Sequence, residues 1–325
     1  MKLTIFTPTY NRAHTLQRLY DSLRIQKDIR FEWLIIDDGS TDDTESLIRS
    51  FQSEDNPFSI RYYKQEHGGK PRAQNWAVDL AEGEYFITCD SNKYLSENAV
   101  ESIFRMFKSI TETPNMCGIG GYRANFSGEL VGEAMKLGEA GFADCTIFEQ
   151  DQYRISGDKA HAFYTEVIRK YKSPEYPGET FVSEGVWLLP MAMDGYKTRW
   201  FSEILIHGEY APDGLTLQSA NGYIGHYNNF MGYLHYLRLE IQARGTRPVL
   251  FMIHEALDIA REKRISDEKL ASLLGCSNEQ LRKIKYVRLW HKCYGKLSMF
   301  VKKAVGDKTV ERLKFIMKNR IRRKN

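Results

Sequence analysis

The chain has few cysteines, no long apolar run and no recognisable leader, and each shortage excludes a class of protein. Its five cysteines are scattered over 325 residues without the spacing of a metal-binding pair, which argues for a reducing compartment and against a disulfide framework. No apolar stretch approaches the roughly 18–20 residues of a membrane-spanning helix. The start MKLTIFTPTYN lacks an uninterrupted apolar core and a small-residue cleavage site, so it predicts a strand and not a signal peptide. We therefore expect a cytoplasmic protein.

Charge is distributed unevenly along the chain. The formal net charge is +4, but residues 282–325 contain 16 lysines and arginines and only two acids, a local charge of +14. Bulky apolar residues such as Trp290 and Phe300 alternate with these cations. This tail therefore predicts a basic amphipathic helix that lies on an anionic membrane surface. A solvated helical tail is the alternative.

The first hundred residues alternate between strand and helix patterns. Strands are expected over residues 2–7, 31–36, 60–64 and 84–89, and helices between them have apolar residues at helical spacing. This alternation predicts βαβ units and a mixed, mainly parallel sheet flanked by helices, an α/β fold.

Beyond about residue 115 the pattern changes. Short strands are expected over residues 118–124 and 202–207, and a helix over residues 161–171. From residue 228 onward the pattern is almost wholly helical and becomes basic. We therefore expect an α/β domain over residues 1–225 and a helical, basic C-terminal extension over residues 226–325.

Polar residues directly follow three of the predicted strands. They are Thr7-Pro-Thr-Tyr-Asn-Arg12, Asp37-Asp-Gly-Ser40 and Asp90-Ser-Asn92. Ligands of a parallel α/β sheet bind outside the carboxyl ends of its strands, so these segments predict one crevice. A carboxylate after the second strand can accept the N3–H of a uracil ring or the hydroxyls of a ribose. The alternative is that it only shapes the turn and caps the next helix.

Two of the loops favour phosphate. Gly68-Gly-Lys-Pro-Arg72 opens a helix, where glycines allow close approach of the backbone and the helix N-terminus attracts anions. Such a loop is often only a turn. Asp90, followed by an amide oxygen at Asn92, suits Mg²⁺ or Mn²⁺ on a diphosphate, and an Asx turn that caps the next helix is the alternative.

Together these residues resemble the inverting glycosyltransferases of family 2, which have the GT-A (nucleotide-diphospho-sugar transferase) fold. The family elements I-P-T-Y-N-R, V-D-D-G-S-T-D and D-S-D-D are similar to residues 7–12, 36–42 and 90–93. The family element Gly-Gly-x-x-x-Ala-x-Asn is similar to residues 67–75. The resemblance covers residues 3–95 and implies a GT-A-type domain that transfers a sugar from a nucleoside-diphosphate donor, expected to be UDP-linked.

The resemblance also implies donor-site and metal-site residues. Those expected to contact the donor are Pro8, Thr9, Tyr10, Arg12, Asp37, Asp38, Gly69, Lys70, Asp90 and Ser91. Those expected at a metal ion are Asp90, Asn92 and Asp213. Asn92 departs from the pattern because the family commonly has an acid there, and Lys93 adds positive charge beside it. A dependence on Mn²⁺ or Mg²⁺ is therefore left open.

Inverting transfer also needs a base that takes the proton of the acceptor hydroxyl. The family has this acid before a helix on the acceptor side, and Glu184 resembles that position best; the alternative is an acid favoured by the helix dipole. Asp158, Lys159 and Glu179 are expected to line the acceptor pocket. The acceptor is expected to be a lipid-linked or saccharide chain in surface polysaccharide synthesis, at the inner face of the cell membrane.

Two other functions stay open. Residues 267–282 have a helix-turn-helix pattern with a turn at Gly275, which would suit a nucleic-acid partner. The same spacing occurs in ordinary helical hairpins, so nucleic acid is the weaker expectation. The departure at Asn92 and Lys93 would also suit a degenerate transferase that binds a nucleotide-sugar without turnover.

Overall fold

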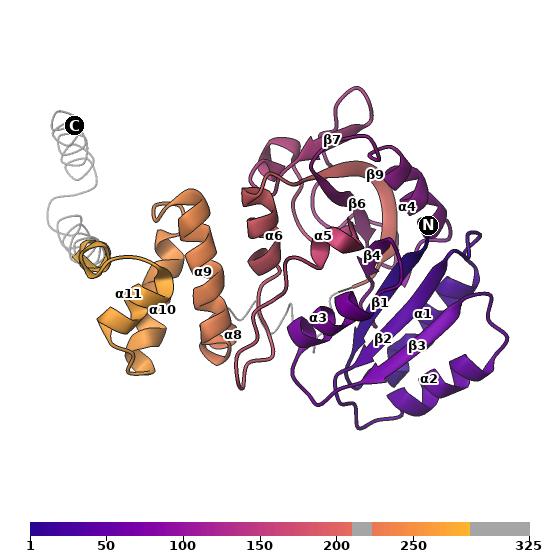
Figure 1. Ribbon diagram of the computed structural model, residues 1–325, viewed down its shortest axis with the longest axis horizontal. Coiled ribbons are helices and arrows are strands. Elements are labelled where there is room, and N and C mark those ends of the chain that lie inside the picture. Colours follow the sequence, from indigo (N-terminus) through magenta and orange to yellow (C-terminus); the bar gives the residue numbers. More distant parts are fainter. Residues whose placement is uncertain (210–222, 287–325) are drawn as a thin grey trace, which may run out of the picture. The chain divides into compact units, whose positions relative to one another are not determined.

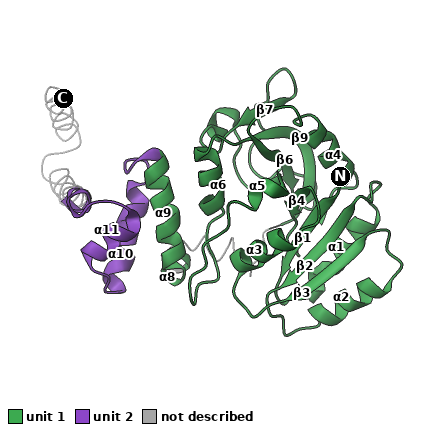
Figure 2. Ribbon diagram, in the orientation of Figure 1, with its two compact units in different colours: residues 1–243 green, residues 244–325 purple. Residues whose placement is uncertain are grey.

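A computed structural model describes residues 1–209 and 223–286 of the chain (Figure 1). The chain divides into two compact units, residues 1–243 and residues 244–325 (Figure 2). The domain boundary near residue 225 stays a prediction. In the part of the chain that the structure describes, no helix is long and apolar enough to cross a membrane.

A nine-stranded sheet forms the centre of the first unit, and its first four strands are parallel to their neighbours in that set. These strands are β1 (Leu3–Thr9), β2 (Phe31–Asp37), β3 (Ser59–Lys64) and β4 (Tyr85–Thr88), in the spatial order β3-β2-β1-β4. β2 is buried along its whole length, as expected for a strand covered on both faces. The predicted parallel α/β half is confirmed.

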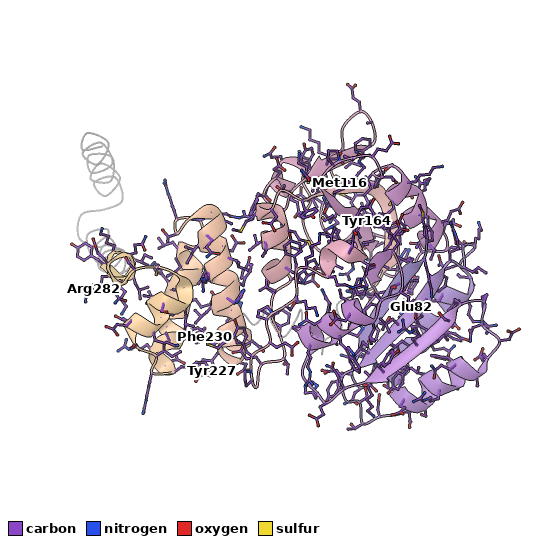
Figure 3. All side chains as sticks on the ribbon, viewed as in Figure 1. Glu82, Met116, Tyr164, Tyr227, Phe230 and Arg282 are labelled. Atoms are coloured by element: carbon purple, nitrogen blue, oxygen red, sulfur yellow. The ribbon has the colours of Figure 1, made fainter. Side chains whose placement is uncertain are left out.

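The second half of the sheet is mixed. Its strands are β5 (Tyr94–Leu95), β6 (Met116–Ala124), β7 (Phe142–Cys145), β8 (Lys159–Tyr164) and β9 (Lys197–His207). β8 lies between β4 and β6 and is antiparallel to both. Figure 3 accordingly shows Met116, at the start of β6, near Tyr164, at the end of β8.

The helix predicted over residues 161–171 is wrong over its first half. Residues 161–164 belong to β8, and only the short helix α5 (Thr165–Ile168) follows. Ala160 and Ala162 point into the core on one face of the sheet, while Phe163 packs on the other. The backbone partners that β4 and β6 supply on both sides outweigh the local preference of this alanine-containing segment.

Helices cover both faces of the sheet. α1 (Ala13–Arg24), α2 (Thr44–Ser53) and α4 (Ala99–Lys108) pack on one face around Trp33. α3 (Lys70–Leu80), α5 and α6 (Gly185–Met193) pack on the other face around Phe86. The first unit is therefore a three-layer α/β structure, as expected from the resemblance to proteins with the GT-A fold.

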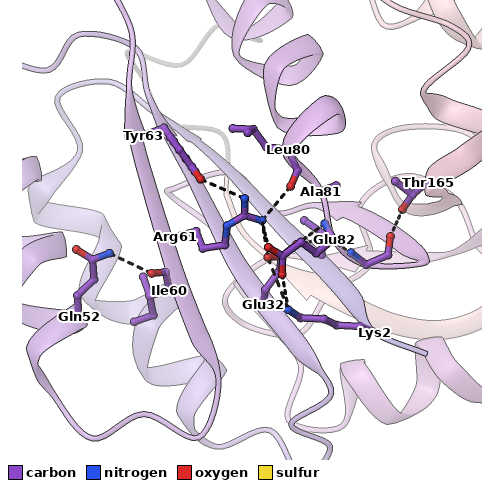
Figure 4. A network of polar contacts seen from close by, with 12 residues as sticks. Lys2, Glu32, Gln52, Ile60, Arg61, Tyr63, Leu80, Ala81, Glu82 and Thr165 are labelled. Atoms are coloured by element: carbon purple, nitrogen blue, oxygen red, sulfur yellow. Dashed lines mark hydrogen bonds and ion pairs between the residues drawn. The ribbon is translucent and has the colours of Figure 1, made fainter.

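A buried charge network holds the opposite, amino-terminal edge of the parallel strands (Figure 4). Glu32 has no exposed surface, and its carboxylate accepts hydrogen bonds from Thr4 Oγ1 (2.6 Å), from the backbone N–H of Glu82 (2.8 Å) and from Arg61 Nη1 (2.9 Å). A buried carboxylate is tolerated because all of its strong contacts are donors.

The remaining described helices follow β9. α8 (Tyr223–Asn228) and α9 (Phe230–Arg244) come first, and α10 (Leu250–Glu262) and α11 (Asp267–Leu274) belong to the second unit. Ser266 caps α11, Gly275 ends it in the left-handed conformation (φ +69°), and residues 278–286 are helical. The helical hairpin predicted for residues 267–282 is therefore present.

Candidate active site

A cavity of about 920 Å³ opens at the carboxyl ends of the parallel strands. Loops after β1, β2 and β4 line one side, together with the start of α3. The strand register aligns these loops, since Thr9 at the end of β1 pairs with Asp37 at the end of β2. The opposite side comes from β6, from residues 157–161 and from the segment before α6. The predicted crevice is present, at the place that parallel α/β sheets offer to ligands.

Most residues predicted for the site line this cavity. They are Pro8, Thr9, Tyr10, Arg12, Asp38, Gly69, Lys70, Asp90, Ser91, Asn92, Asp158, Lys159 and Glu184. Their contacts with donor or acceptor stay predictions.

Three predicted residues do not lie in the described lining. Asp37 is fully buried, and its carboxylate accepts hydrogen bonds from the backbone N–H of Ser40 (2.8 Å) and from the Tyr62 hydroxyl (2.7 Å). Glu179 accepts hydrogen bonds from the backbone N–H groups at the start of α9, at 2.7 and 2.8 Å. Asp213 lies outside the described residues.

Asp38 organises the glycine-rich loop that precedes α3. Its Oδ1 accepts hydrogen bonds from Gln65 Nε2 (2.6 Å) and from the backbone N–H of Gly68 (2.8 Å). Its Oδ2 accepts one from the backbone N–H of Gly69 (2.9 Å) and lies 2.8 Å from His67 Nδ1. Both carboxylate oxygens thus hold the loop, so Asp38 sets the position of the start of α3.

Gly69 allows that loop to touch the far side of the cavity. Its φ of +87° favours glycine, and a Cβ built there would lie 1.9 Å from the carbonyl oxygen of Thr180. Asn229, just before α9, fixes the Thr180 segment by accepting hydrogen bonds from the backbone N–H groups of Thr180 and Phe181 at 3.0 Å. The loop before α3 and the segment before α6 therefore meet at Gly69.

An aromatic pair lies at one end of the cavity. The rings of Tyr10 and His67 stack with centroids 4.4 Å apart, and Tyr10 is 42% exposed. Their faces and edges offer a flat, amphipathic surface at the end of β1, where the base of a nucleoside can pack.

Lys70 joins the two acids predicted for the chemistry. Its Nζ lies 3.0 Å from Asp90 Oδ1 and 3.5 Å from Glu184 Oε1. Burial alone would lower the pKa of Lys70, but the carboxylates of Asp90 and Glu184 raise it above its ordinary value. The ammonium group is therefore charged at neutral pH and lies between the end of β4 and the start of α6.

Asp90 is paired with a second cation, Lys93, whose Nζ contacts Oδ2. Burial would raise the pKa of Asp90, but the two ammonium groups outweigh it and hold this pKa well below its usual range. Asp90 is thus an ionised carboxylate with a lysine on each oxygen.

The side chains around Asp90 fit a divalent ion poorly. Mg²⁺ and Mn²⁺ need several oxygen ligands, preferably ionised. Here both oxygens of Asp90 are taken by ammonium groups, and Asn92, whose Nδ2 donates to the carbonyl oxygen of Glu209 (3.3 Å), offers only a neutral amide oxygen. Within residues 1–209 and 223–286, no three His, Cys, Asp or Glu residues are grouped as a metal site would require.

The side of the cavity formed by β6 and residues 157–161 contains further charged groups. Arg123 on β6 is only 3% exposed and forms an ion pair with Asp158. Lys159 donates a hydrogen bond to the carbonyl oxygen of Val131 (2.8 Å). His161 Nε2 lies 2.7 Å from Thr198 Oγ1, and burial lowers the pKa of His161 to about 3, so this ring is neutral. The Glu184 side chain, which also lines the cavity, is 59% exposed and therefore accessible to a ligand.

Lining residues that sequence reasoning missed include His67 and Arg123, and the pairing of Lys93 with Asp90 was also missed. His67 stands directly before the paired glycines, so its position gave a local signal. Arg123 is a charged residue inside an otherwise apolar and glycine-rich strand, which indicates a buried ion pair. Lys93 lies three residues after Asp90, and nothing in the sequence apart from the presence of a lysine indicated that the two side chains form an ion pair.

Comparison with known proteins agrees with this geometry. Residues 4–141 match the family model "Glycosyl transferase family 2". The chain is 37% identical over 105 residues to the chondroitin synthase of Pasteurella multocida, an alignment that covers 32% of this chain and 11% of that protein. It is 29% identical over 103 residues to the poly(ribitol-phosphate) beta-N-acetylglucosaminyltransferase TarS of Staphylococcus aureus, covering 31% of this chain and 18% of that protein. The chain thus spans a minor part of these relatives.

A solved structure shares the fold over most of the chain. The crystal structure of S. aureus TarS residues 1–349 in complex with UDP-GlcNAc superimposes with a TM-score of 0.55 at 16% identity, covering 90% of this chain and 92% of that one. At this identity the likeness shows the fold alone.

Proposed function

Because residues 4–141 match the model of glycosyl transferase family 2, we propose that this chain transfers a sugar, with inversion, from a nucleoside-diphosphate donor to an acceptor hydroxyl. The observation that carries the proposal is the position of Lys70, whose ammonium group contacts both Asp90 and Glu184 inside the cavity. A donor diphosphate near Lys70 would lie beside Asp90 with its sugar toward Glu184.

In the proposed reaction Glu184 acts as the base. The acceptor oxygen forms a bond to the anomeric carbon while the bond from that carbon to the diphosphate oxygen breaks. The Glu184 carboxylate takes the hydroxyl proton, and the electron pair of the broken bond leaves with the nucleoside diphosphate. Lys70 stabilises the charge that develops on the leaving oxygen, because its ammonium group is already held in place by two carboxylates before the charge develops.

UDP is the proposed nucleotide. The TarS structure that shares the fold contains UDP-GlcNAc, and TarS is 29% identical to this chain over 103 residues. The stacked rings of Tyr10 and His67 provide the surface for the base. Pro8, Thr9 and Arg12 would border the nucleoside.

The proposed acceptor is a saccharide or lipid-linked saccharide of a surface polysaccharide. One curated relative is named a chondroitin synthase and the other a poly(ribitol-phosphate) beta-N-acetylglucosaminyltransferase, so both names refer to polymers. Asp158 and Lys159 would border this acceptor opposite the donor. The basic segment 287–325, outside the described residues, would hold the protein at an anionic membrane surface on the cytoplasmic side.

The first experiment is a calorimetric and thermal-shift panel of UDP, GDP, CMP and dTDP. We expect one nucleotide, UDP, to bind and to raise the melting temperature, because a ligand that binds only the folded state stabilises it. Binding by none of the four would refute the proposed function.

A second experiment tests turnover with Glu184→Gln. Loss of the base should lower kcat by about 10²–10⁴ while nucleotide binding changes little, since general-base catalysis contributes about that much. Glu166→Gln on α5, an exposed acid away from the cavity, is the matched control. If the wild type binds the nucleotide but transfers no sugar to any of a range of saccharide acceptors, the protein is a degenerate transferase that only binds the donor. The pairing of Asp90 with two lysines is the observation that favours this alternative.

A further inference from the structure

The turn after β4 places a lysine where a metal-binding turn would place an acid. Lys93 Nζ contacts Asp90 Oδ2, and the backbone N–H of Lys93 donates to the carbonyl oxygen of Asp90 (2.9 Å). The Lys93 side chain is only 15% exposed, yet it lines the cavity. It is therefore directed into the site and not into solvent.

The end of β9 is shaped to accept this lysine. A Cβ built on Gly208 would lie 2.5 Å from Lys93 Cγ and 3.2 Å from Lys93 Cβ, so glycine leaves the space that the lysine stem fills. Gly208 is fixed in turn, since its backbone N–H donates to the carbonyl oxygen of Ala124 (2.8 Å). Two segments far apart in the sequence thus hold the ammonium group in one place.

The charges of this cluster suit a diphosphate without a metal. Asp90, Lys70 and Lys93 carry a net charge of +1 among themselves, and the Glu184 carboxylate, 3.5 Å from Lys70, brings the four groups to neutral. Both ammonium groups lie on the cavity wall. Each has three N–H donors; Asp90 takes one from each and Glu184 takes a second from Lys70, so donors on both lysines remain for phosphate oxygens. A divalent ion bound to Asp90 would have to displace a lysine or lie beside one, and both arrangements are unfavourable.

We propose that the ammonium groups of Lys93 and Lys70 bind the diphosphate of the donor in place of a divalent cation, so that donor binding needs no metal. This inference rests on the proposed function, because it concerns the donor site of that reaction. It explains both why Asn92 stands where an acid is common and why a lysine follows it. The remaining carboxylate, Asp90, positions two lysine ammonium groups and not a metal ion.

The test is calorimetric titration of UDP into the full chain, in EDTA and in MnCl₂. We expect the wild-type Kd to differ by less than about threefold between the two conditions. Lys93→Ala should weaken binding in EDTA by about tenfold or more, because a charge-assisted contact to phosphate is lost. Lys93→Arg should restore most of the affinity, whereas Lys108→Ala, which removes an exposed lysine of α4, should change nothing.

Two further variants test the same proposal if Lys93→Ala does not fold. Gly208→Ala retains every charge but displaces the Lys93 stem, so it should weaken UDP binding in EDTA while circular dichroism stays native. The double variant Asn92→Asp with Lys93→Asp should convert UDP binding from metal-independent to Mn²⁺-dependent.

The outcomes separate the two proposals. Wild-type binding that is lost in EDTA and restored by Mn²⁺ would overturn the lysine-for-metal inference and leave the glycosyltransferase proposal intact. Equal affinity of Lys93→Ala and wild type in EDTA would also overturn the inference. No binding of UDP, GDP, CMP or dTDP under either condition would overturn the proposed function, and the inference with it.

Discussion

Replacing Asp38 by alanine should destabilise the protein even when no ligand is present. Its carboxylate accepts three hydrogen bonds, from Gln65, Gly68 and Gly69, and contacts His67. Hydrogen bonds to a charged group contribute about 1.5–3 kcal/mol each, so three give an upper bound of about 5–9 kcal/mol. Gln65 and the partly exposed Gly68 regain hydrogen bonds to water, whereas Gly69 is buried against Thr180 and does not.

We therefore expect the free energy of unfolding to fall by about 3 kcal/mol. This is the cost of leaving one buried N–H donor unsatisfied and of losing the contacts that hold the loop before α3. For a unit of this size such a loss lowers the melting temperature by about 6–12 °C. Differential scanning calorimetry of the ligand-free protein measures it, with Asp55→Ala, an exposed aspartate, as the control. If Asp38 acted only on the nucleotide, the melting temperature of the free protein would stay unchanged and only UDP affinity would fall. That result would refute the positioning role that we assign to Asp38.

Two other changes give equally direct tests. Gly69→Ala should lower the free energy of unfolding by about 2–6 kcal/mol, because a side chain at φ +87° and ψ 167° costs about 1–3 kcal/mol and the contact with Thr180 adds overpacking of about the same size. Gly178→Ala, at a φ of +79° with nothing within 4 Å, should show only the first of these losses in chemical denaturation, so equal losses for the two variants would contradict the close approach. His161 should make unfolding pH-dependent. Its pKa is about 3 in the folded protein and 6.5 ordinarily, so between these values the unfolded chain binds a proton that the folded protein does not, and stability falls by up to about 1.4 kcal/mol per pH unit as pH drops through this window. His161→Gln, which keeps a partner for Thr198, should flatten that slope, and an unchanged slope in denaturation curves from pH 7 to pH 4 would assign it to other groups.

The parallel half of the fold could be predicted from local patterns because each element carries its own signal. β1, β2 and β4 are short, mainly apolar runs, β3 is a short run of β-favouring residues, and α1 and α2 have an apolar stripe at helical spacing. Right-handed βαβ connections then bring the carboxyl ends of these strands to one edge. This is why the loops after β1, β2 and β4 could be assigned to one crevice before any contact was known.

The mixed half could not be predicted in the same way. β8 was mistaken for a helix because its strand character depends on β4 and β6, which lie far from it in the sequence. Glu179 was assigned to the acceptor pocket, whereas its carboxylate accepts hydrogen bonds from the start of α9. Local propensity contains no information about which distant backbone groups will meet a residue.

By itself, the sequence determined the chemistry available at the site: acids and glycines at strand ends, an amide and a lysine where an acid is common, and a basic tail. Only the tertiary structure decided what those groups do to one another. Lys70 reaches Glu184 across 114 residues, Gly69 touches Thr180, and Gly208 makes room for Lys93. Strand order and packing set these distances, and because the strength of a charge–charge contact depends on distance and burial, the ionisation of Asp90 and the fit of a metal ion were decided there.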